Sequence, residues 1–83
     1  MYRVHLRKKA KKELNKIPPE FKKRIIASLL YLSQDPFIGE PLLGQFKGFY
    51  SLHLHPYRII YTIYKNQLLV IIERIRHHKD AYK

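Results

Sequence analysis

The spacing of the apolar residues changes along this chain of 83 residues, and that change constrains the fold more than any other feature. Between residues 7 and 33 apolar residues recur every three to four positions, which is typical of amphipathic helices. From residue 46 onward they recur at every second position, which is typical of strands with one buried face. A chain this short buries only roughly 60% of its unfolded surface, so it supports one core between two layers. We therefore expect a single α+β domain over residues 1–83.

The first half of the chain predicts a strand followed by two helices. Residues 2–6 alternate apolar and polar side chains, which favours a short strand. A basic helix is expected over residues 7–17, and Pro18-Pro19 ends it because proline is tolerated in a first helical turn but not in an interior. The second helix then runs to about Ser33. The two helices should form an antiparallel hairpin.

The second half predicts three strands, which gives the order β-α-α-β-β-β. Residues 50–54 alternate, with Tyr50, Leu52 and Leu54 on one face. After a break at His55-Pro56 the alternation resumes, and Lys65-Asn66 suggests a two-residue hairpin turn before a last strand over residues 68–75. We expect an antiparallel sheet with both helices on one face, which leaves the other face for function.

The charge of the chain predicts a polyanionic partner. The formal net charge is +11, and residues 7–24 hold nine basic side chains against two acidic ones. A field of this sign speeds encounter with phosphate groups and makes binding fall with salt. The lysines that we expect to contact such a partner, a nucleic acid, are Lys8, Lys9, Lys11, Lys12 and Lys47.

Composition also excludes several classes of protein. The chain has no cysteine, so a disulfide framework, a thiolate metal site and a cysteine nucleophile are all excluded. Its longest apolar runs are far shorter than the ~20 residues of a membrane span, and the N-terminus has no apolar signal region. We expect a cytoplasmic protein without a membrane partner.

The residues able to carry chemistry gather near the open face of the predicted sheet. His53 and Arg58 lie on consecutive strands, and the tail after the last strand supplies more basic and proton-transferring groups: Arg76, His77, His78, Lys79 and Tyr82. This set suits cleavage of a phosphodiester, since arginine neutralises phosphate oxygens while histidine or tyrosine moves protons. The chain has no HExxH motif and no glycine-rich phosphate loop, so we expect neither a metal nor a cofactor.

Each of these features also has a purely structural interpretation. Arg58 taken alone is as consistent with a solvent-facing ion pair as with a functional role. His53 is likewise consistent with an ordinary polar side chain on a solvent-exposed face. The basic tail by itself is consistent with a contribution to solubility. Only their joint occurrence favours a functional site.

The segment YRIIYTIYKNQLLVIIERIRHHKDAY, residues 57–82, resembles the C-terminal half of RelE/ParE-superfamily toxins. The upstream LLGQFKGFYSLHL resembles the stretch of that family that precedes an aromatic-rich strand. With the basic first helix, the resemblance covers essentially the whole chain. It implies the compact RelE-like fold and, in the RelE branch, a ribosome-dependent, metal-independent endoribonuclease that cleaves mRNA.

The resemblance also implies roles for individual residues. Arg58 matches the arginine that contacts the scissile phosphate, Arg76 a second phosphate-stabilising arginine, and Tyr82 the tyrosine that helps to activate the 2′-OH. His78 stands where many relatives carry an arginine. Two lysines of RelE are replaced by Ser51 and His53, and histidine can serve as an acid–base group in place of lysine.

The same resemblance implies partners and leaves alternatives open. The expected partners are mRNA on the ribosome, ribosomal RNA and an acidic cognate antitoxin. A ParE-like inhibitor of DNA gyrase would need no nuclease chemistry, and so would not need Arg58, Arg76, Tyr82 and His53 together. An inactive or degenerate RelE-like protein that only binds nucleic acid is the third alternative.

Overall fold

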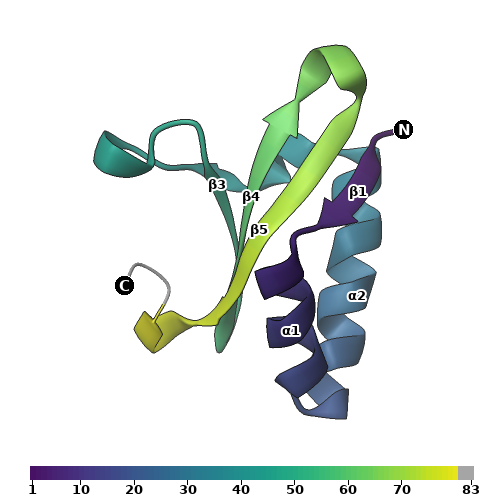
Figure 1. Ribbon diagram of the computed structural model, residues 1–83, viewed down its shortest axis with the longest axis vertical. Helices are drawn as coiled ribbons and strands as arrows, with labels where there is room; N and C mark the ends of the chain where they lie inside the picture. The colour runs from purple at the N-terminus through teal and green to yellow at the C-terminus, as the bar shows by residue number, and fades with distance from the viewer. Residues whose placement is uncertain (81–83) are drawn as a thin grey trace.

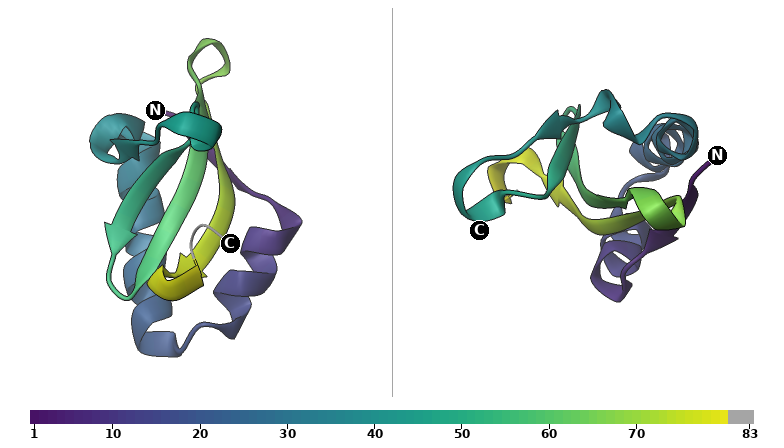
Figure 2. Two further views of the ribbon diagram at one scale, coloured as in Figure 1. Left: turned by 90° about the vertical axis from the view of Figure 1, so that its left-hand side faces the viewer. Right: turned by 90° about the horizontal axis from the view of Figure 1, so that it is seen from above.

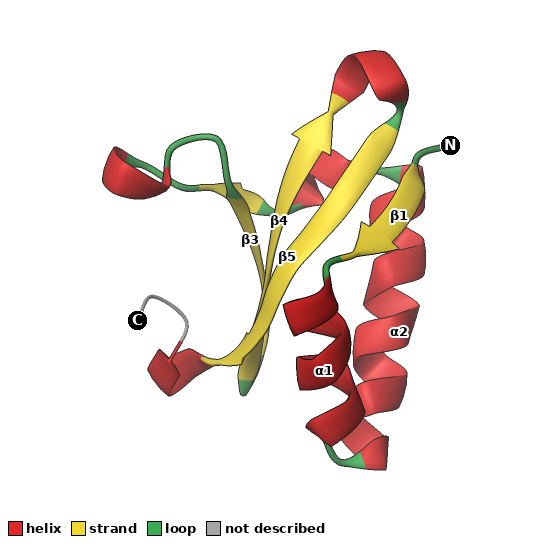
Figure 3. Ribbon diagram, in the orientation of Figure 1, coloured by secondary structure: helices red, strands yellow, loops and turns green. Residues whose placement is uncertain are grey.

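The computed structural model describes residues 1–80, which form one five-stranded sheet and two helices (Figures 1 and 3). The elements in chain order are β1 (Arg3–Leu6), α1 (Lys8–Lys16), α2 (Pro19–Gln34), β2 (Glu40–Pro41), β3 (Tyr50–Leu54), β4 (Tyr57–Tyr64) and β5 (Leu69–His77). Single turns of 3₁₀ helix connect several of them. The predicted order of strand, two helices and three strands is confirmed, with β2 as an additional two-residue strand. Within residues 1–80, neither helix combines the length and the apolar character that crossing a membrane requires.

The sheet has the strand order β1-β5-β4-β3-β2. The four strands from β2 to β5 pair in antiparallel fashion, as expected. The edge strand β1 pairs in parallel with β5, with Val4 opposite Val70 and Leu6 opposite Ile72. The parallel pairing is possible because the two helices and three further strands carry the chain from β1 to β5. An irregularity between Ile60 and Tyr61 shifts the pairing of β4 with β5.

The two helices occupy different places around the sheet. Figure 2 shows α2 across one face, whereas α1 continues from β1 along the edge of β5. The side chain of Glu13 on α1 accepts a hydrogen bond from the backbone N–H of Ile75 on β5 at 2.8 Å. Ala10 and Ile17 of α1 join the same core as Ile25 of α2, so both helices pack on the sheet as expected, with α1 displaced toward the edge of β5 where β1 ends.

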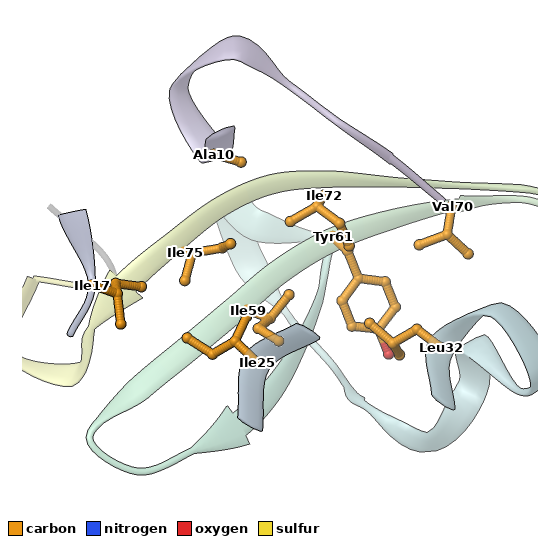
Figure 4. Close-up of a cluster of buried hydrophobic side chains, with 9 residues drawn as sticks. All are labelled: Ala10, Ile17, Ile25, Leu32, Ile59, Tyr61, Val70, Ile72 and Ile75. Carbon is orange, nitrogen blue, oxygen red and sulfur yellow. The ribbon is translucent and has the colours of Figure 1, made fainter. Parts of the chain in front are cut away.

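The core lies between α2 and the sheet, with α1 closing one side (Figure 4). Its members are Ala10, Ile17, Ile25, Leu32, Ile59, Tyr61, Val70, Ile72 and Ile75. The Tyr61 hydroxyl donates to the carbonyl of Pro36 at 2.7 Å and accepts from the N–H of Gly39 at 3.0 Å. A side chain at Gly39 would collide with that hydroxyl, so glycine is required there.

The turn between β4 and β5 differs from the predicted two-residue hairpin. Lys65–Gln67 form a turn of 3₁₀ helix, and Leu68 follows in the left-handed conformation with φ of 49°. The prediction failed because Leu68 gives no sequence signal for a conformation that glycine or asparagine usually adopts.

Candidate functional site

Three of the predicted site residues form one row across the sheet. His53 on β3 lies directly opposite Arg58 on β4, and Arg58 lies directly opposite Arg76 on β5. Directly opposed residues of antiparallel strands point to the same face. That face is the one away from α2, because Ile59 and Ile75 of the neighbouring row are buried in the core. The expected juxtaposition of His53 and Arg58 is present, and Arg76 extends it.

Contacts from the sheet and from α1 hold the arginines of this face. Ser51 is buried, and its hydroxyl lies 3.5 Å from Nη1 of Arg58. The Glu13 carboxylate accepts hydrogen bonds from Nη2 of Arg74 at 2.8 Å and from Nε at 3.2 Å, and lies 3.5 Å from Nε of Arg76. Glu13 therefore joins α1, the edge of β5 and two arginines in one network.

Electrostatics within this network keep Arg74 cationic. The hydrogen bond with Glu13 raises the pKa of Arg74 despite partial burial, which acts in the opposite direction. A second pair forms nearby, where Nε of Arg7 lies 2.8 Å from a Glu73 oxygen and that hydrogen bond raises the pKa of Arg7. The other Glu73 oxygen accepts from the Thr62 hydroxyl at 2.9 Å.

A basic cavity of about 410 Å³ lies between the start of α1 and the sheet. It is lined by Arg7, Lys8, Lys9, Phe49, Glu73 and Arg74. We call the row of His53, Arg58 and Arg76 the arginine row. Arg74 belongs both to the lining of the cavity and to the Glu13 network that reaches Arg76, so the cavity adjoins the arginine row. Two of the predicted RNA-binding lysines thus lie next to the row.

The remaining predicted RNA-binding residues are exposed. Lys11 and Lys12 lie on the solvent side of α1, whose buried residue is Ala10. Lys47 is exposed in the loop that leads from β2 to β3, just after a turn of 3₁₀ helix.

The tail brings His78 back to the β3–β4 turn. The His78 backbone N–H donates to the Pro56 carbonyl at 2.7 Å, and its ring lies 5.3 Å from that of His55. His77 is the last residue of β5 and packs edge-on against Tyr57 at 5.7 Å. Tyr82 lies outside the described residues.

Sequence reasoning missed several contributors to this site. Glu13 and Arg74 were not singled out, although Arg74 precedes Arg76 by two residues and so shares its side of a strand. A lone acid within a run of lysines was the only signal for Glu13. His55 gave no signal for its contact with His78, because that contact depends on the path of the tail.

The arrangement fits recognition of a phosphodiester. Two arginines in a row offer donors to the non-bridging oxygens, and imidazoles beside them can accept or donate protons near neutral pH. Among residues 1–80, no cluster of three or more histidine and carboxylate side chains has a geometry suited to a metal ion.

Comparisons with known proteins identify the family. Residues 4–82 match the family model of the ParE toxin of the type II toxin–antitoxin system parDE. Toxin RelG of Mycobacterium tuberculosis is 32% identical over 88 residues, which cover 99% of this chain and 97% of the relative.

Solved structures show the same fold. The toxin–antitoxin complex RelBE2 of Mycobacterium tuberculosis contains a chain with a TM-score of 0.86 and 29% identity, covering 92% of this chain and 96% of that chain. The E. coli RelBE complex gives a TM-score of 0.80 at 19% identity, with 93% and 96% of the two chains covered. The protein therefore belongs to the RelE/ParE superfamily of toxins from type II toxin–antitoxin systems.

Proposed function

We propose that this toxin is a ribosome-dependent endoribonuclease that cleaves mRNA with its own side chains. The observation that carries the proposal is the row formed by His53, Arg58 and Arg76. Two cations and an imidazole side by side on one sheet face suit phosphoryl transfer, in which charge builds on the non-bridging oxygens. An inhibitor that only binds another protein has no need for that arrangement.

In the proposed reaction the 2′-oxygen of the substrate forms a bond to the adjacent phosphorus, and the bond from phosphorus to the 5′-oxygen breaks. Arg58 and Arg76 stabilise the pentavalent phosphate. The 2′-OH proton passes to a base, and the leaving 5′-oxygen receives a proton. His53 and His78 are the histidines proposed for these transfers, and the family resemblance adds Tyr82 as the group that activates the 2′-OH.

The basic surface of α1 is the proposed contact with ribosomal RNA. Lys8, Lys9, Lys11 and Lys12 are all exposed, and Lys47 adds a further cation from the loop before β3. Phosphate contacts of this kind position a protein on RNA without reading its sequence. The bound ribosome would then present mRNA to the arginine row.

The decisive experiment compares two reactions of the same purified chain. The parent and Arg58→Ala are added to a translation extract, and mRNA ends are mapped; in parallel, both are tested for trapping of cleaved plasmid DNA by gyrase. We expect new mRNA ends with the parent and none with Arg58→Ala.

The gyrase arm addresses the second candidate function, which the match to the ParE family model favours. Trapped DNA without mRNA cleavage would establish a ParE-like inhibitor and contradict the nuclease. The absence of both cleaved mRNA and trapped DNA would favour a degenerate toxin that only binds nucleic acid.

We also propose that an acidic antitoxin neutralises this chain, as the complexes of its relatives suggest. An apolar groove of about 430 Å³ separates β1 from α2, and its lining includes Met1, Leu6, Ile26 and Leu30. Met1 and Leu30 are 85% and 66% exposed, which marks an interaction surface rather than a packed face. The net charge of +11 favours a partner segment that combines apolar anchors with carboxylates.

The variant Leu30→Asp tests this groove. It should abolish co-purification with the antitoxin while mRNA cleavage persists, and intact co-purification would remove this groove from the interface.

A further inference from the structure

Four of the five histidines of the chain gather where β3 and β5 end and β4 begins. The rings of His53 and His55 are nearly parallel, with an angle of 10° and a centroid distance of 6.1 Å. His55 lies 5.3 Å from His78 at 29°, and His78 lies 4.6 Å from His77 at 32°. We call His53, His55, His77 and His78 the imidazole platform.

Backbone contacts hold both ends of the platform in place. The Pro56 carbonyl accepts the His78 N–H at 2.7 Å and lies 3.2 Å from Nδ1 of the same residue. At the other end, His53 is fixed by its pairing with Arg58 in the sheet. The backbone of the platform is therefore held in place at both ends, and the ring of His78 has a partner of its own.

Most of the platform is open to solvent. His53, His55 and His78 are exposed or half-exposed, and His77 is half-buried against Tyr57. A stack of imidazoles at the surface contributes nothing to the core, which is formed by other residues. A role in binding explains why these planar rings are gathered on the surface.

We propose that the imidazole platform stacks with the bases of single-stranded RNA that flank the phosphate held by Arg58 and Arg76. The inference rests on the proposed function for the identity of the ligand. His53 belongs both to the platform and to the arginine row, so one strand of RNA can contact both with successive groups. Proteins that bind single strands combine cationic grooves for the backbone with aromatic side chains for the bases, and histidine is one of the side chains that stack on unpaired RNA bases.

The rings of the platform, and not the charge around it, favour RNA over an acidic protein segment as the occupant. Both ligands would be attracted by Arg58 and Arg76, but a carboxylate makes no use of parallel rings, whereas every base has a face that stacks. Apolar anchors of a protein partner have their own surface in the groove between β1 and α2. The platform therefore supplies base contacts that the arginine row lacks.

His55 provides the sharpest test because it lies between His53 and His78 and has no role in the proposed chemistry. The variants are His55→Ala, which removes the ring, and His55→Phe, which keeps a flat ring. His5→Ala is the matched control, since His5 is the one histidine outside the platform and is exposed on β1. Affinity for a fluorescent single-stranded hexaribonucleotide is measured by anisotropy at fixed pH and salt, and thermal melting verifies that each variant is folded.

We expect His55→Ala to weaken RNA binding on the order of 5- to 150-fold, the range for loss of one stacked base. His55→Phe should stay within about threefold of the parent, and His5→Ala should match the parent. Equal loss in His55→Ala and His55→Phe would overturn the stacking inference, and so would an unchanged His55→Ala or a parent that does not bind the oligonucleotide. A loss of antitoxin affinity in His55→Ala without a loss of RNA affinity would assign the platform to the protein partner instead.

This experiment separates the inference from the proposed function. Binding of the oligonucleotide requires neither the ribosome nor cleavage. If the translation extract shows no mRNA cleavage but the ring-dependent loss of binding is seen, the nuclease fails and the platform stands. If cleavage is seen and the ring of His55 is irrelevant, the platform fails and the nuclease stands.

Discussion

Arg58 and Arg76 are directly opposed across β4 and β5, so two guanidinium groups share one row of the sheet face away from α2. Like charges in directly opposed positions destabilise a sheet. Glu13, at 3.5 Å from Arg76, offsets part of that repulsion from the side of α1. The pair is unfavourable for folding, but it suits the phosphate ligand that we propose for this face.

Replacement of Arg58 should therefore separate activity from stability. We expect Arg58→Met to slow mRNA cleavage by about 10²- to 10³-fold, the typical effect of losing one donor to the transition state. Its melting temperature should stay close to that of the parent, because relief of repulsion with Arg76 opposes the loss of contacts such as the one with Ser51. Calorimetry and mapping of mRNA ends provide the two measurements. A folded variant that cleaves as fast as the parent would show that Arg58 is not part of the site.

Glu13 should contribute to stability through its N–H partners on β5. Glu13→Ala leaves the Ile75 N–H and the Arg74 guanidinium without this acceptor, which should lower the free energy of unfolding by about 2 kcal/mol. Glu13→Gln keeps one acceptor oxygen, so its free energy of unfolding should fall by less than that of Glu13→Ala. Chemical denaturation of both variants tests this, with Glu40→Ala as the exposed control. Equal stability of Glu13→Ala and Glu40→Ala would mean that the network does not hold α1 to the sheet.

Tyr61 should make the fold sensitive to alkaline pH. Burial is the main cause that raises the pKa of Tyr61 to about 12, against an ordinary value of about 10. The folded state therefore keeps the phenol protonated over a range in which the unfolded chain ionises. The contribution of the protonated Tyr61 phenol to the free energy of unfolding is fully present below about pH 10. It falls by about 3 kcal/mol as the pH rises to about 12.

Tyr61→Phe isolates that contribution. The variant should be less stable at neutral pH by about 1–3 kcal/mol, because the Gly39 N–H and the Pro36 carbonyl lose their partner. Its stability should decline less steeply than that of the parent between about pH 10 and pH 12. Tyr64→Phe, at a position that is 41% exposed, is the control. Parallel alkaline profiles for Tyr61→Phe and the parent would contradict the assignment.

The sequence predicts those parts of the fold that depend on local spacing. Apolar periodicity identifies both helices and the strands β3, β4 and β5, and alternation along β3 and β4 places His53 and Arg58 on one face. The parallel pairing of β1 with β5 was not predictable, because the paired segments lie far apart in the sequence, with Arg3 opposite Leu69. No periodicity exists in the two residues of β2. The stack of His55 on His78 likewise depends on where the chain turns after β5.

The lysines of α1 should determine how strongly binding to the ribosome depends on salt. Reversal of charge at Lys8, Lys9, Lys11 and Lys12 should weaken binding and reduce the slope of log affinity against log salt by roughly 0.7–0.9 for each phosphate that the helix no longer neutralises. The matched control reverses four other exposed cations that lie outside α1, Arg3, Lys23, Arg24 and Lys65, and therefore changes the net charge equally. Sedimentation with ribosomes over a series of salt concentrations measures both slopes. If the two variants lose affinity to the same extent and with the same slope, the attraction is due to net charge alone. A reduced slope in the α1 variant only would place this helix on ribosomal RNA, next to the cavity that Lys8 and Lys9 share with Arg74.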